Sequence, residues 1–157
     1  MKKVVLAIIV RGRQVLLGCK RGNPEMGMGK LNGPGGKQEP GETLRECLVR
    51  EVKEEFGIML DSVKMEEVAV ITVFAEGEKE YVLHVFRTET FSGEPMETES
   101  MDTPKWYDID SLPFERMHES DKEWFLYAAC GKKFHANVHN QGRKGEGFFG
   151  IDLFLSK

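Results

Sequence analysis

Residues 36–58, GKQEPGETLRECLVREVKEEFGI, hold the part of the chain that best predicts its fold. Thr43 is followed three positions later by Glu46, which is the spacing of a capping box at a helix N-terminus. Gly57 comes directly after the acidic cluster and is typical of a helix C-terminal stop. The segment therefore predicts a helix from about Leu44 to Phe56.

Three glutamates of this predicted helix fall on one face. Glu51, Glu54 and Glu55 occupy positions i, i+3 and i+4, which a turn of ~100° per residue brings together. The same arc carries Leu44 and Leu48, and an amphipathic helix normally keeps such a stripe apolar and buried. Carboxylates on the inward side repel one another and lose solvent, so we expect them to shift their pKa values or to bind a cation. Oxygen ligands favour Mg²⁺, with Mn²⁺ as the other candidate.

An isolated acidic run on a helix usually lies in solvent and pairs with Lys and Arg. The spacing of the whole segment favours another interpretation. Its order is Gly36, five residues, Glu42, seven residues, Arg50-Glu51-Val52, one residue, Glu54-Glu55, one residue, Gly57-Ile58. This order matches every position of the Nudix box, so the chain resembles the Nudix hydrolases, which cleave a nucleoside diphosphate linked to another group. The resemblance implies an α+β Nudix fold, a mixed β-sheet sandwiched between α-helices.

Composition narrows the class of protein further. A chain of 157 residues that is 40% hydrophobic can form one domain with a real core, and we expect a single domain over residues 1–157. A net charge of −4 provides no basic surface for duplex nucleic acid. The Nudix resemblance implies a small-molecule nucleotide as the partner, and we expect a monomer or homodimer. The apolar run VVLAIIV at 4–10 is too short to span a membrane and lacks a cleavage site, so we expect a buried strand. Cys19, Cys47 and Cys130 are odd in number and widely spaced, which predicts reduced thiols in a cytoplasmic protein.

Periodicity and turn residues predict the remaining elements. Strands are expected at 4–10 and 15–17, at 68–74 and 81–88, at 106–107, and on either side of a glycine-rich turn at 142–147. Residues 22–36 contain six glycines and two prolines and are predicted to form a loop. A second helix is expected from about 120 to 130.

The Nudix resemblance assigns roles to the box residues. It implies that Glu51, Glu54 and Glu55 share the metal-ligand and general-base roles, and the sequence does not say which one is the base. Glu42 and Arg50 are expected to form a salt bridge that orients the box. The other expected contacts are the carbonyls of Gly35 or Gly36 on the metal, Lys20 and Lys37 on the substrate, and the loop acids Glu99 and Asp102 as assistants at the metal.

Outside the box, the chain resembles one branch of the family, the animal-type hydrolases of oxidised purine nucleoside triphosphates. The likeness rests on GMGKLNGPGGK, LHVF, KWYDIDSLPFERM, and WF followed by GKKFHANVHNQG. It implies a Mg²⁺-dependent hydrolase of phosphorus-containing acid anhydrides. Such an enzyme converts nucleotides such as 8-oxo-dGTP to the monophosphate plus pyrophosphate, and so removes damaged precursors of DNA.

The same branch implies a purine pocket. Asn32 matches an asparagine that hydrogen-bonds the purine. Ser120 and Asp121 match two adjacent aspartates that contact the base edge, so one of the two acids is absent here. His118 replaces a tryptophan that stacks on the base, whereas Phe74 is a retained aromatic.

Two alternatives remain open. One is a Nudix hydrolase of another substrate, such as a nucleotide sugar, a dinucleoside polyphosphate or capped RNA. The other is a non-catalytic nucleotide-binding domain, which the intact box glutamates make the weaker alternative.

Overall fold

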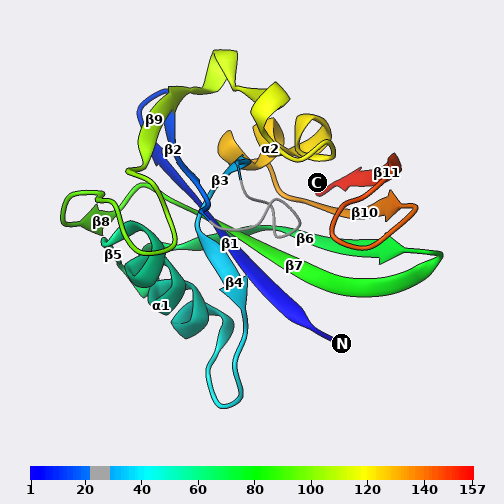
Figure 1. The fold of residues 1–157 in the computed structure, drawn as a ribbon, viewed down its shortest axis with the longest axis horizontal. Helices are drawn as coiled ribbons and strands as arrows, with labels where there is room; N and C mark the ends of the chain where they lie inside the picture. The colour runs from blue at the N-terminus through cyan, green and yellow to red at the C-terminus, as the bar shows by residue number, and fades with distance from the viewer. Residues whose placement is uncertain (22–28) are drawn as a thin grey trace.

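Strand β1 (Lys3–Arg11) lies inside the sheet and is buried on both faces. Its side chains alternate between two hydrophobic cores, as the two-residue period of a strand requires. Val5, Ala7 and Ile9 face the core that contains helix α1 (Leu44–Phe56), and Leu6, Ile8 and Val10 face the core that contains helix α2 (Asp121–Ala129). The sheet is therefore sandwiched between the two helices (Figure 1), as expected from the sequence.

The computed structural model describes residues 1–21 and 29–157. Within these ranges, nine strands form one mixed sheet in the order β11-β10-β6-β7-β1-β2-β3, with β4 paired to β1 and β9 to β2. The remaining bounds are β2 (Gln14–Cys19), β3 (Leu31–Asn32), β4 (Gly35–Lys37), β6 (Glu66–Ala75), β7 (Glu78–Thr88), β9 (Lys105–Asp108), β10 (Phe134–Asn140) and β11 (Phe148–Leu155). The pairs β1–β7 and β6–β10 are parallel. Two short strands, β5 (Met59–Leu60) and β8 (Phe91–Ser92), form a separate pair, and 3-10 turns occupy Ser62–Lys64, Ile109–Ser111 and Phe114–Arg116.

Helix α1 has the bounds and caps that its sequence predicts. The Thr43 side chain accepts a hydrogen bond from the Glu46 backbone N–H, and the Glu46 carboxylate accepts one from the Thr43 N–H. At the other end, Gly57 has φ 71°, a left-handed conformation that favours glycine. These local contacts fix both ends of the helix that carries the box.

The prediction of a loop over 22–36 is wrong for part of this segment. Leu31–Asn32 pairs with Gly18 and Cys19 of β2, and Gly35–Lys37 pairs with β1 from Val4 to Leu6. Residues this rich in glycine have low strand propensity, so the pairing comes from the tertiary contact. Residues 22–28 of this predicted loop lie outside the described ranges. The other predicted strands and the second helix are confirmed.

Across the described ranges, no helix combines the length and the apolar composition that crossing a membrane requires.

Candidate active site

A cavity of about 470 Å³ lies on the α2 side of the sheet and reaches Glu55 of α1. A ligand pocket of this size can hold a nucleotide-sized molecule. The predicted site residues that line it are Lys20, Asn32, Gly35, Gly36, Lys37, Glu55, His118, Ser120 and Asp121. A neighbouring hollow shares Glu55 and the glycines with this cavity and adds Glu51. The fold therefore brings most of the predicted residues into one connected space.

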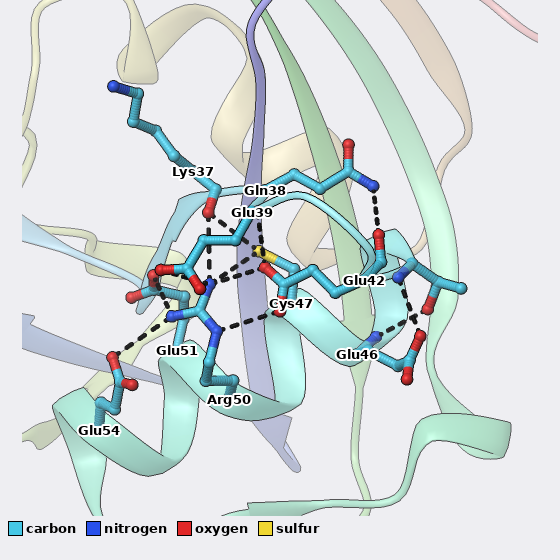
Figure 2. A network of polar contacts seen from close by, with 10 residues as sticks. Lys37, Gln38, Glu39, Glu42, Glu46, Cys47, Arg50, Glu51 and Glu54 are labelled. Carbon is cyan, nitrogen blue, oxygen red and sulfur yellow. Dashed lines mark hydrogen bonds and ion pairs between the residues drawn. The ribbon is translucent and has the colours of Figure 1, made fainter.

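Arg50 organises the polar side of α1. Its guanidinium donates two hydrogen bonds to the Glu42 carboxylate, at 2.8 and 3.1 Å, and one to Glu51 Oε1 at 2.9 Å (Figure 2). It also donates to the Lys37 carbonyl at 3.3 Å. The hydrogen bonds from Arg50 lower the pKa of Glu42 to about 2, so this pair stays charged at neutral pH. The expected salt bridge between Glu42 and Arg50 is confirmed, and it holds Glu51 beside the glycine strand.

Cys47 lies on α1 beneath this network. Its side chain is fully buried, and its Sγ donates to the Lys37 carbonyl at 3.4 Å. Burial raises the pKa of this thiol to about 12. Cys47 therefore packs as a neutral, apolar group.

Glu55 is the carboxylate that enters the cavity from α1. It is 6% exposed, and its Oε1 accepts a hydrogen bond from the Gly35 backbone N–H at 2.8 Å. Burial raises its pKa to about 7, and the nearby Glu51 carboxylate adds to this rise. Burial also raises the pKa of Glu51. Two carboxylates in this state favour a cation between them.

Glu54 does not share the buried face. Its side chain is 59% exposed and lies 3.5 Å from Arg50. The prediction of three inward carboxylates is therefore wrong for Glu54, because a step of ~100° from Glu55 carries it to the edge of the helix face. Within the described ranges, no three His, Cys, Asp or Glu side chains form a ready metal-binding cluster.

The two expected loop acids do not line the cavity. Asp102 pairs with Arg21 at 2.8 Å, and the same arginine binds Glu97 at 2.6 Å. Glu99 is exposed. The pairing with Arg21 holds this acidic loop at the surface, where the sequence had suggested an approach to the metal.

The far part of the cavity contains a second buried carboxyl group. Asp121 is 4% exposed, its Oδ2 accepts a hydrogen bond from the His118 backbone N–H at 3.2 Å, and burial raises its pKa to about 7. Burial lowers the pKa of His118, and the charge of Lys30 adds to this. Asn32 lines the same cavity, and its Oδ1 accepts from the Gly33 N–H at 2.9 Å.

Phe74 lies on the opposite face of β6 from the cavity. Ile71 and Val73 line the cavity, whereas the Phe74 ring stacks on His139 with centroids 5.2 Å apart. Burial alternates without a break along this part of β6, so the two-residue period of the strand puts Phe74 on the other face from Ile71 and Val73. The structure therefore corrects the placement of Phe74 in a base pocket.

Sequence reasoning missed several cavity residues. These are Lys30, Tyr81, Met101, Trp124, Asn140 and Lys144. Asn140 gave a usable signal, because it falls on the same alternating face of its strand as Phe134, Ala136 and Val138. A polar residue at a core-facing position of a strand calls for a hydrogen-bond partner.

The comparisons with known proteins agree with this geometry. Residues 1–128 match the NUDIX domain, so the chain belongs to the Nudix family. The oxidized purine nucleoside triphosphate hydrolase of Danio rerio is 37% identical over 142 residues, which cover 90% of this chain and 88% of the fish protein. The enzyme with the same name from Mus musculus is 34% identical over 130 residues, which cover 82% of this chain and 80% of the mouse protein.

A solved structure of similar length has the same fold. The MutT protein from Bacillus halodurans matches with a TM-score of 0.78 and 26% identity, over 98% of this chain and 97% of that protein. The Nudix fold and the hydrolase class expected from the box are thus confirmed.

We expect Asp121→Asn to change how the stability of the protein depends on pH. Burial raises the pKa of Asp121 from 3.8 to about 7, so the folded state favours the protonated form. Its stabilising contribution is complete below pH ~4 and is lost as pH rises to ~7, by at most ~1.4 kcal/mol per pH unit. Urea unfolding from pH 4 to 8 should show Asp121→Asn gaining stability relative to the unchanged protein across this window. Glu119→Gln alters an exposed neighbouring carboxyl and serves as the control; parallel pH curves for Asp121→Asn and the unchanged protein would contradict the prediction.

Proposed function

We propose that the protein is a Mg²⁺- or Mn²⁺-dependent pyrophosphohydrolase that converts oxidised purine nucleoside triphosphates, such as 8-oxo-dGTP, to the monophosphate plus pyrophosphate. The observation that carries this proposal is one cavity that runs from Glu55 of the Nudix box to the buried carboxyl group of Asp121. The names of the fish and mouse relatives support the same substrate class. The reaction would take place in a small-molecule pocket. We assign the protein to the cytoplasm, because its three cysteines are free thiols and free thiols persist in that compartment.

The box residues fit a divalent cation. Nudix hydrolases use such an ion, and the buried carboxylate of Glu55 and the partly buried one of Glu51, beside the backbone of Gly35 and Gly36, supply the oxygen ligands that Mg²⁺ prefers. The pKa of Glu55 is raised because burial removes water from its carboxylate. A bound cation would replace this lost solvation. A bound divalent cation supplies charge neutralisation at the phosphates and a lowered pKa for water.

The protein groups would then divide the remaining work. Glu51, Glu54 and Glu55 share the roles of ligand and of base that accepts the proton of the attacking water. Lys20 and Lys37, which line both hollows, bind phosphate oxygens. Together these groups would stabilise the negative charge that develops on the leaving pyrophosphate in the transition state.

The purine base of the substrate would occupy the far part of the cavity. With a pKa of about 7, Asp121 is partly protonated at neutral pH, and its neutral form donates a hydrogen bond where the charged form accepts one. Asn32 and Ser120 supply further polar contacts from the cavity wall, and the neutral imidazole of His118 provides a flat surface for the purine.

The decisive test compares kcat/KM for 8-oxo-dGTP and dGTP with Mg²⁺, while the released product is identified as pyrophosphate or phosphate. A ratio well above ten with pyrophosphate released supports the proposal, because this ratio measures discrimination by the base pocket. Similar slow rates on both nucleotides would remove oxidised purines as the substrate and favour another nucleoside diphosphate derivative.

We expect Arg50→Lys to weaken Mg²⁺-dependent activity by about 10- to 100-fold, since outer contacts that orient metal ligands have effects of this size. Lysine keeps the charge but cannot bind the Glu42 carboxylate through two N–H groups while also holding Glu51. The measurement is the initial rate as a function of Mg²⁺ concentration. Arg13→Lys, which alters a surface pair with Asp110, is the matched control, and an unchanged Mg²⁺ dependence in Arg50→Lys would refute the orienting role.

A further inference from the structure

Asn140, the last residue of β10, places a polar side chain in the wall of the cavity. The residue is 4% exposed, and within the described ranges its Oδ1 has no hydrogen-bond partner. The neighbouring wall residues Val73 and Val138 are apolar. A buried carbonyl oxygen without a partner is destabilising, so this acceptor points to a donor that arrives with the ligand.

The backbone of Asn140 is held on both sides. It pairs with Ala75 of β6 and with Phe148 of β11. The turn that follows is closed by a hydrogen bond from the Gln141 N–H to the Gly147 carbonyl at 3.0 Å. The carboxamide therefore projects from a fixed point, which lowers the entropy cost of binding a ligand through it.

Asn140 belongs to the part of the cavity that would hold the base. His118 and Asp121 line the same space, and a Cβ built on Gly145, after the β10 strand, would stand 3.9 Å from His118 Nδ1. The hollow beside Glu51 shares its lysines, glycines and Glu55 with the cavity, but Asn140, His118 and Asp121 do not line it. With the phosphates near the box glutamates, the purine ring would reach Asn140.

We propose that Asn140 determines specificity by hydrogen-bonding the oxidised edge of the purine, an inference that rests on the proposed function. Oxidation at C8 turns N7 from an acceptor into an N–H donor and adds a carbonyl oxygen at C8. The Asn140 carboxamide complements this pair, because Oδ1 accepts from N7–H and Nδ2 donates to the C8 oxygen. An unmodified purine presents an acceptor and a C–H group at this edge, so it leaves one half of the carboxamide without a partner.

The test is Asn140→Leu, which replaces the carboxamide with an apolar group of similar volume. We expect kcat/KM for 8-oxo-dGTP to fall at least tenfold, because both hydrogen bonds to the oxidised edge are lost, and kcat/KM for dGTP to stay within about twofold, because the loss of its single contact is offset by removal of the unpartnered oxygen. The melting temperature should be equal or higher, because the unpartnered polar group is removed. Asn140→Ala provides a second variant that adds no bulk to the cavity.

Asn137→Leu is the matched control. Asn137 is half-buried on the same strand and pairs with Thr72 of β6, on the face of the sheet away from the cavity. The same chemical change at this position should leave both kcat/KM values unchanged.

Two results separate this inference from the proposed function. If the protein without substitutions hydrolyses 8-oxo-dGTP and dGTP equally well, the proposed function is refuted. If the preference for 8-oxo-dGTP over dGTP survives in both Asn140 variants, the role of Asn140 is refuted. Calorimetric binding of 8-oxo-dGMP and dGMP without metal gives a readout independent of hydrolysis. A preference for 8-oxo-dGMP that disappears in Asn140→Leu supports the role of Asn140, whereas equal losses for both ligands, or no preference to lose, overturn it.

Discussion

Replacing Glu55 with Gln is expected to lower kcat for pyrophosphate release by about 10³-fold, within the range for loss of a positioned acid or base. Glu55 is the box carboxylate that lies in the cavity, with its Oε1 bound to the Gly35 N–H. Glutamine keeps the shape of the side chain and can accept that hydrogen bond, but it cannot take a proton or offer full negative charge to a cation. Steady-state kinetics with Mg²⁺ and 8-oxo-dGTP would measure the loss.

The stability of Glu55→Gln separates a chemical role from a structural one. Burial raises the pKa of Glu55 to about 7, so the charged form destabilises the metal-free fold. We therefore expect the melting temperature of Glu55→Gln at pH 8 to equal or exceed that of the unchanged protein. Glu115→Gln, at an exposed glutamate, serves as the control, and a kcat of Glu55→Gln within threefold of normal would exclude Glu55 from the chemistry.

Gly36→Ala is expected to reduce kcat by about 100-fold, because small displacements of positioned groups have effects of this order. A Cβ at this position would stand 2.4 Å from Oε1 of Glu51, closer than atoms can approach. The Glu51 side chain would have to move, and its hydrogen bond with Arg50 would be lost or distorted. Kinetics together with thermal melting would show activity falling far more than stability.

A glycine elsewhere in the sheet provides the comparison for Gly36→Ala. Gly150 of β11 has open space around the position of an added Cβ, so Gly150→Ala should leave kcat unchanged. Full activity in Gly36→Ala would show that Glu51 has room to shift without consequence for the reaction.

Local signals in the sequence predicted the elements better than the contacts between them. The capping box at Thr43, the glycine at position 57 and the period of the helix were sufficient to place α1, because all three act within a few residues. Helical periodicity also grouped the glutamates, but it could not say which part of their arc faces the core. The packing of α1 on β1 decides this, and it buries Glu55 while leaving Glu54 in solvent.

The base end of the cavity was harder to predict, because it is built from segments far apart in the chain. Parallel pairing brings β10 beside β6, and this contact places Asn140 in a wall with Val73. The resemblance placed Phe74 in the base pocket, but the alternation of β6 puts it on the opposite face from Ile71 and Val73, which line the cavity. The matched motifs identified Asn32 and Asp121 as cavity residues, whereas the motif match for Phe74 conflicted with the alternation of its own strand.

The buried thiol of Cys47 has a consequence for a protein that would meet oxidised nucleotides. Peroxides attack the thiolate form of cysteine, and a pKa of about 12 keeps that form scarce at physiological pH. The sulfur lies one helical turn from Arg50, at 3.6 Å from its guanidinium, so a sulfenic or sulfinic acid there would disrupt the box. Burial of this single atom would therefore protect the helix that carries the Nudix box from oxidation by peroxides.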